Sequence, residues 1–186
     1  LFHDVFQKAF SPDTQIKLAK ESAIQIAQRI GSKAVSNKRL IIGEPYCPYK
    51  IPMHTKDFWC MVLVSDVSYV FTANHRSPTK AIVRLSDFSV RLKTAEAGRS
   101  LKSKLVPEAS SIIGVEIYTY QDNWPDGYFE QRLLSKPLLT LFKKIDFHPV
   151  IEFEFSPLHL RVTSSFRFAS HCVEQVQIFQ ELMVLA

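Results

Sequence analysis

The sequence of 186 residues predicts one α+β domain, in which an antiparallel or mixed β-sheet carries helices on one face. Amphipathic patterns near both ends predict an N-terminal and a C-terminal helix, and strand-like segments dominate the chain between them. Helices and strands do not alternate regularly, which disfavours a doubly wound parallel sheet. We expect a single domain over 1–186, with a helical and extended part over 1–57 and a core of sheet and helices over 58–186.

The N-terminal helix is expected over residues 12–30. Ser11 is a suitable N-cap, and Pro12 fits the first helical position, where its missing N–H costs nothing. Gly31 then supplies the left-handed residue that ends many helices. One stripe of the helix is apolar and must pack against the rest of the domain: Ile16, Ala19, Ala23, Ile26, Ala27 and Ile30.

Residues 31–57 predict less regular structure. Leu40 and the two isoleucines after it are expected to start a short strand. Three prolines within 44–52 predict an extended, irregular connection, because proline fixes φ and lacks an N–H donor. Tyr46 and Tyr49 lie in this connection and are candidate binding residues, although tyrosines in such a segment also lie flat over the edge of a core.

Strands dominate the next part of the chain. Residues 58–65 are nearly all apolar, which predicts a central strand covered on both faces. β-favouring residues continue over 68–73, and 74–78 has the composition of a turn. Two further strands are expected over 81–85 and 88–92, and short turns between the strands favour antiparallel pairing.

The last third of the chain mixes helices and strands. Residues 94–111 predict a basic loop or short helix, followed by a strand over 113–120 in which Ile113, Val115 and Ile117 alternate. A helix is expected over 136–145, and alternating apolar residues over 150–163 predict a hairpin. A helix over 171–185 ends the chain, with Val173, Val176, Phe179 and Met183 on its inner stripe.

Basic residues concentrate in 76–104, which carries eight bases and two acids, whereas 105–186 carries six bases and ten acids. Such asymmetry is typical of a basic binding face, although a surface on which both signs mix in space gives the same counts. Such a face binds nucleic-acid phosphates, lipid headgroups or acidic proteins. The candidate binding residues of this region are Arg76, Lys80, Arg84, Arg91, Lys93, Arg99, Lys102 and Lys104.

Most familiar chemistries lack their motifs here. The sequence contains no glycine-rich phosphate loop, no G-x-S-x-G nucleophile turn and no H-E-x-x-H zinc motif. Cys47, Cys60 and Cys172 are far apart and odd in number, which predicts reduced thiols in the cytoplasm or another reducing compartment. No cofactor or metal is expected, and no apolar run is long enough to predict a transmembrane segment.

The sequence therefore predicts a non-enzymatic protein-interaction or scaffold domain, as a subunit or soluble portion of a larger assembly with a protein partner. Residues 45–52 and 76–104 offer the contact surfaces. One alternative is binding of nucleic acid or an anionic surface through 76–104, although no aromatic residue alternates with these bases on one face. The other is an enzyme with a dispersed site, for which the residues to test are His75, Asp66, His159 and Glu152.

Overall fold

The computed structural model describes residues 11–40, 46–77, 90–92, 104–119, 135–156, 158–166 and 168–185, of which 90–92, 104 and 119 are described by their backbone alone. The elements in chain order are α2 (Pro12–Ile30), β1 (Val35–Ser36), β2 (Tyr49–His54), β3 (Phe58–Val64), β4 (Ser68–His75), β5 (Val90–Leu92), β6 (Lys104–Leu105), α4 (Pro107–Ile113), β7 (Ile117–Thr119), α6 (Lys136–Phe142), β8 (Val150–Ser156), β9 (His159–Ser165) and α7 (Ala169–Leu185).

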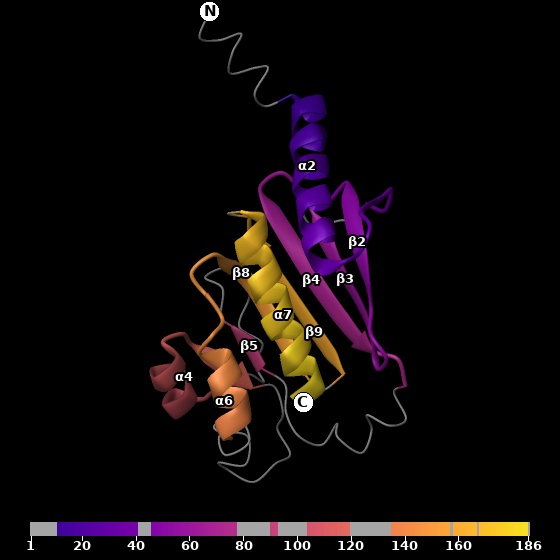
Figure 1. The fold of residues 1–186 in the computed structure, drawn as a ribbon. Helices are drawn as coiled ribbons and strands as arrows, with labels where there is room; N and C mark the ends of the chain where they lie inside the picture. The colour runs from indigo at the N-terminus through magenta and orange to yellow at the C-terminus, as the bar shows by residue number, and fades with distance from the viewer. Residues whose placement is uncertain are drawn as a thin grey trace, which may run out of the picture.

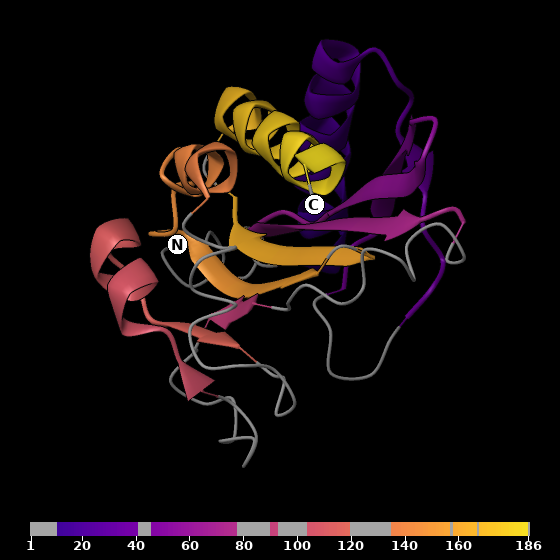
Figure 2. The same cartoon turned by 90° about the horizontal axis from the view of Figure 1, so that it is seen from below.

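The strands of the described residues form one sheet in the order β1-β2-β3-β4-β9-β8-β5-β7-β6. Neighbouring strands are antiparallel throughout. Helices α2, α6 and α7 lie on one side of this sheet (Figures 1 and 2). The predicted α+β class, with an antiparallel sheet and helices on one face, is confirmed.

The core lies between these helices and the sheet. Helix α7 packs on β4 and β9, and it contacts α2 on one side and α6 on the other. Phenylalanine rings join the two layers: Phe179 of α7 lies 5.4 Å from Phe71 of β4 and 6.5 Å from Phe153 of β8, measured between ring centroids. Phe142 of α6 lies 5.9 Å from Phe153. Buried residues from α2 to α7 belong to this one cluster.

Helix α2 forms as predicted, because its end signals are local. The Ser11 hydroxyl accepts a hydrogen bond from the backbone N–H of Thr14 at 3.3 Å, and Gly31 ends the helix in the left-handed region with φ 69°. Ala19, Ala23, Ile26 and Ala27 are buried on its inner side. The stripe is narrower than expected, since Ile16 near the start of the helix is 38% exposed.

Strand β3 corrects one prediction. It lies inside the sheet, but it is not covered on both faces: Trp59 is 62% exposed and Met61 is 37% exposed. Phe58, Cys60, Val62 and Val64 alternate with them and are buried under the helices. Although its residues are nearly all apolar, β3 therefore has one face that is accessible to solvent. We call this side of the sheet the outer face.

The chain around Pro52 corrects another prediction. Residues 49–54 form β2 rather than an irregular connection, and Leu40 belongs to no strand, whereas residues 41 and 42 lie outside the described part. Strand β1, which covers one edge of β2, pairs only with Tyr49 and Lys50. Pro52 therefore lies where β2 is an edge strand, and an edge tolerates the missing N–H.

Ile113 was also expected in a strand, but it is the last residue of helix α4. Pro107 starts this helix, the Ser110 hydroxyl donates to the Val106 carbonyl at 2.6 Å, and Gly114 ends it with φ 86°. The strand begins only at Ile117. The expected helix over 136–145, the hairpin over 150–163 and the C-terminal helix are present as α6, β8–β9 and α7.

Candidate functional site

The outer face brings together side chains from distant parts of the sequence. Residues paired across neighbouring strands lie about 5 Å apart on the same face. Two adjacent rows of such residues cross β3, β4 and β9: Met61, Thr72 and Arg161 form one row, and Trp59, Asn74 and His159 form the other. These rows are the centre of the candidate site.

Trp59 and Met61, together with Arg76, form what we call the Trp59 patch. The guanidinium carbon of Arg76 lies 4.1 Å from the centroid of the Trp59 ring. Arg76 is held there because its Nε donates to the Phe58 carbonyl at 3.2 Å and its backbone N–H donates to the Asp57 carbonyl at 2.8 Å. A cation over an exposed indole contributes about 0.5–1 kcal/mol. The patch is thus a fixed aromatic and cationic surface.

A cavity of about 340 Å³ adjoins this patch on the outer face, and we call it the basic cavity. Residues 37–40 and 46–47 form its wall, and side chains of β2, β3, β4 and β9 form its floor. Its cationic lining residues are Arg39, Lys50 and Arg161, and none of the described residues that line it is acidic. Leu40, Met61 and Leu63 add apolar surface.

Asn37 positions the wall of the basic cavity. Its backbone N–H donates to the Pro48 carbonyl at 2.7 Å, and its side-chain amide donates to the Cys47 carbonyl at 2.8 Å. Its side-chain oxygen accepts from the backbone N–H of Arg39 at 3.4 Å. One asparagine therefore ties residues 37–39 to residues 47–48 and places Arg39 at the cavity.

His159 and Arg161 present the polar end of the cavity. His159 Nδ1 lies 2.8 Å from Asn74 Oδ1, and since that oxygen only accepts, Nδ1 carries the proton. Burial lowers the pKa of His159, nearby Glu154 opposes this effect, and Arg161 adds to it, so the ring is neutral at neutral pH. Arg161 Nε lies 3.9 Å from Glu152 Oε2, so β8 supplies acids beside the cavity.

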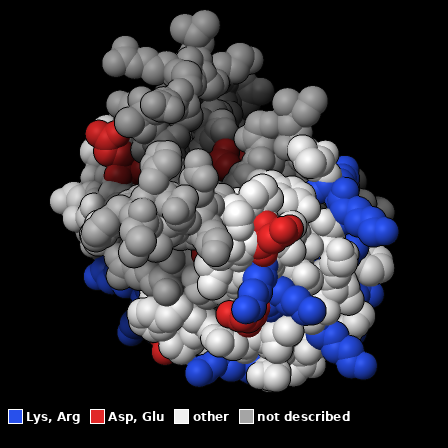
Figure 3. Space-filling view, turned by 90° about the horizontal axis from the view of Figure 1, so that it is seen from above, with Lys and Arg blue, Asp and Glu red and all other residues white. Residues whose placement is uncertain are grey.

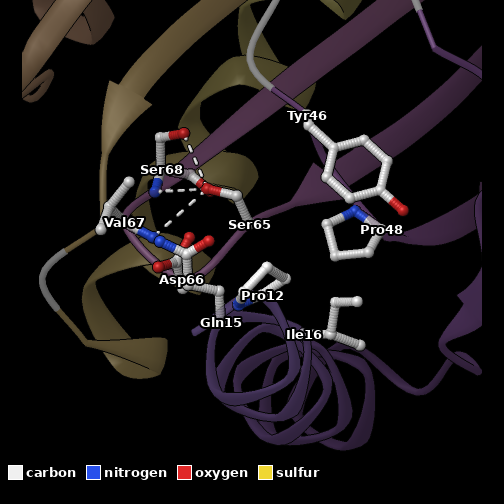
Figure 4. Close-up of a pocket in the computed structure, with 9 residues that line it drawn as sticks. All are labelled: Pro12, Gln15, Ile16, Tyr46, Pro48, Ser65, Asp66, Val67 and Ser68. Atoms are coloured by element: carbon white, nitrogen blue, oxygen red, sulfur yellow. Dashed lines mark hydrogen bonds between the residues drawn. The ribbon is translucent and has the colours of Figure 1, made fainter. Parts of the chain in front are cut away.

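A second cavity, of about 270 Å³, lies between the start of α2 and the turn from β3 to β4 (Figure 4). Pro12, Ile16 and Val67 give it an apolar lining. The Ser65 hydroxyl accepts from the backbone N–H groups of Val67 and Ser68 at 3.2 and 2.9 Å. Ser65 therefore closes the turn, and among the described residues that line the cavity there is no histidine to activate it as a nucleophile.

The two tyrosines of the proline-rich segment differ in position. Tyr46 is 51% exposed and lines both cavities, which suits a binding residue. Tyr49 is half-buried and packs against the core. Cys47 between them is buried, as are Cys60 and Cys172, and none of the three forms a disulfide.

Among the four residues of the dispersed enzyme site, the two acid–histidine pairs Asp66–His75 and Glu152–His159 do not come together. Asp66 precedes β4 and His75 ends it, so about 23 Å of strand separates the two ends. Glu152 pairs with Thr163, four residues or about 13 Å along β9 from His159. Proton relay needs hydrogen-bond reach, so neither pair forms an acid–base couple. Within the described part of the chain, no three His, Cys, Asp or Glu side chains gather as metal ligands.

The basic region 76–104 is only partly described. Arg91 of β5 pairs in register with Glu154, and Lys104 of β6 pairs with Thr119, both known by backbone alone. The others lie outside the described residues: Lys80, Arg84, Lys93, Arg99 and Lys102. At the end where α2 begins, Lys and Arg side chains spread around the surface with acids among them, and the described residues form no single basic patch there (Figure 3).

Sequence reasoning named Arg76 and Tyr46 as binding candidates, and it did not name Trp59, Arg39, Lys50 or Arg161 as such. The exposure of Trp59 was hidden because the expected two-sided burial of 58–65 assigned it to the core. Lys50 was hidden because its segment was not expected to be a strand. The alternation of polar and apolar residues in β9, with Arg161 between Leu160 and Val162, was the available signal for a wet face.

Comparisons with known proteins reveal a similarity of fold alone. No protein-family model matches the sequence, and no curated protein is significantly similar to it. The structure resembles the crystal structure of the mycobacterial trehalose monomycolate transport factor A, TtfA, with a TM-score of 0.59 and 10% sequence identity over 90% of this chain and 93% of that chain. In the described residues, no helix is both long and apolar enough to cross a bilayer.

Proposed function

From the premise of a fold similar to that of a transport factor, we propose that this chain is a non-enzymatic protein-interaction domain of a larger assembly. It contacts a protein partner through the Trp59 patch. That neighbour is a transport factor, which supports the proposal. The three buried thiols, none of them in a disulfide, support a reducing compartment such as the cytoplasm.

The observation that carries the proposal is the exposed indole of Trp59, 62% accessible and stacked by Arg76. Tryptophan, methionine and arginine are enriched at the centres of protein interfaces, where a few such residues supply most of the binding energy. Because hydrogen bonds to the backbone already hold Arg76, binding orders little that is not ordered in the free chain.

The test is photocrosslinking in cells of the native source. Benzoylphenylalanine replaces Trp59 in one variant and Leu18 in a control, since Leu18 is an exposed apolar residue on α2. We expect a discrete protein adduct from position 59 that is absent from position 18. A chain that forms no adduct at position 59, and that runs alone as a monomer when purified from its source, would contradict the proposal.

Nucleic-acid binding through the 76–104 region is the second candidate. One observation supports it: Arg76 and Trp59 place a cation and an exposed aromatic ring on the same surface. Single-stranded nucleic acids bind to such pairs by stacking and by phosphate contacts. Affinity for single-stranded RNA should then fall steeply between 50 and 200 mM salt, and salt-independent retention would exclude this mode.

A further inference from the structure

Three cationic residues line the basic cavity, and none of the described residues that line it is acidic. Neither Arg39 nor Lys50 forms an ion pair within the described part of the chain, and only Arg161 lies near an acid, at 3.9 Å from Glu152. Like charges that share a small cavity repel each other, and an anion among them removes this cost. The charge of the cavity therefore favours an anionic occupant.

Neutral hydrogen-bonding groups accompany these charges. Asn74 uses its side-chain oxygen to accept from His159, which leaves its amide N–H groups as donors at the cavity. Thr72, a hydroxyl-bearing residue, also lines the cavity, between Met61 and Arg161 in the same row. Guanidinium, ammonium and amide donors together suit the oxygens of a carboxylate or phosphate.

The remaining lining limits the occupant in size and polarity. Met61 and Leu63 present apolar surface on the floor, and Leu40 adds more at the wall. The volume of about 340 Å³ is at the low end of pockets that hold small molecules. An occupant that matches the whole lining has one anionic end and a short apolar part.

We propose that the basic cavity binds a small organic anion, a carboxylate or phosphate monoester that carries an apolar group. Arg39, Lys50 and Arg161 hold the anionic end, and Met61 and Leu63 contact the apolar part. This site is separate from the proposed protein contact, since its cations lie outside the Trp59 patch, although Met61 belongs to both.

The experiment is an NMR titration of the ¹⁵N-labelled chain with octyl phosphate, octyl glucoside and inorganic phosphate, with the two octyl compounds kept below their critical micelle concentrations. We expect saturable shifts of the amides around Arg39, Thr72 and Arg161 with octyl phosphate, and at least 10-fold weaker binding of the other two. No saturable shift at these amides, or equal binding of all three compounds, would overturn the proposal.

Variants test the charges. The double variant Arg39→Gln, Lys50→Gln should weaken the binding of octyl phosphate at least 10-fold. The control variant Lys17→Gln, Lys20→Gln, on the exposed side of α2, makes the same change in net charge and should leave this binding unchanged. Equal affinities of the two variants would overturn the assignment. Arg39→Gln alone, at an exposed position, serves if the double variant does not fold. Failure of the Trp59 crosslink leaves these outcomes unaffected, so the two proposals fail separately.

Discussion

At the residue scale, His159 carries a cost of burial that depends on pH. Burial disfavours its charged form and holds its pKa below the ordinary value of about 6.5, even though Glu154 on β8 favours the charge and Arg161 on β9 opposes it. The unfolded chain therefore binds a proton at a higher pH than the folded chain does. The neutral form of His159 therefore contributes fully to the free energy of unfolding above about pH 6.5. That contribution is lost as the pH falls toward the pKa of the folded chain.

Replacing His159 should remove that loss. In His159→Gln, which keeps a partner for Asn74, the free energy of unfolding should fall less between pH 7.5 and pH 5.5 than it does in the parent chain. Urea unfolding at the two pH values measures the difference. His148→Gln, at an exposed histidine, is the control and should keep the parental pH dependence. A parental pH dependence in His159→Gln would exclude this explanation.

Burial also controls the cysteines. It raises the pKa of Cys172 to about 12 and raises that of Cys60, where a hydrogen bond with Thr55 and the charge of Arg76 oppose it only in part. At pH 8 Cys172 is therefore almost entirely thiol, and the thiolate is the reactive form. In a Cys47→Ser variant, Ellman's reagent should therefore find no rapidly reacting thiol in the native chain and two in urea. A fast native reaction would mean that one of these sites opens to solvent.

At the element scale, Gly31 determines where α2 ends. Its φ of 69° is a conformation that L side chains rarely adopt, while an added Cβ would meet no atom within 4 Å. The cost of Gly31→Ala is thus conformational and amounts to about 1 kcal/mol of unfolding free energy. Gly31→Asn should cost less, because asparagine tolerates the left-handed region. Urea unfolding of both variants checks the order, and equal costs would contradict it.

Local signals explain which elements were predictable. Ser11 and Gly31 mark both ends of α2, and the alternation around Glu152 and Arg161 marks the β8–β9 hairpin. Such signals fail where tertiary structure decides. The proline at position 52 indicates a connection unless β2 is known to be an edge at that point, which depends on the length of β1. Trp59 resembles a core residue until the helices are known to cover only one face.

At the scale of the whole molecule, the candidate site depends on strand order. Asn74 and His159 are 85 residues apart in sequence and become neighbours only because β9 pairs with β4. The sequence predicted the hairpin that contains His159 and a strand over 68–73, but not the pairing of the two. The basic cavity combines residues from distant parts of the chain in this way, so composition and spacing were unable to reveal it.

The two layers of the molecule meet at Phe179. Its ring contacts Phe71 and Phe153, on different strands, from the centre of α7. Phe179→Ala should lower the free energy of unfolding by about 3–5 kcal/mol, through lost burial and the cavity left behind. Phe168→Ala, at a ring that is 57% exposed, should cost below about 1 kcal/mol. Denaturant titration compares the two, and similar costs would contradict this account of the core.

The edge position of Pro52 has a consequence for how copies of this chain behave in concentrated solution. The Ser32 hydroxyl donates to the Pro52 carbonyl at 2.5 Å, so that carbonyl points away from β3. In an antiparallel strand the nitrogen of a residue points to the same side as its carbonyl, so the exposed edge lacks a donor and has its acceptor occupied at one residue. A strand from a second copy would find no backbone partner there, and this end of the sheet resists edge-to-edge aggregation.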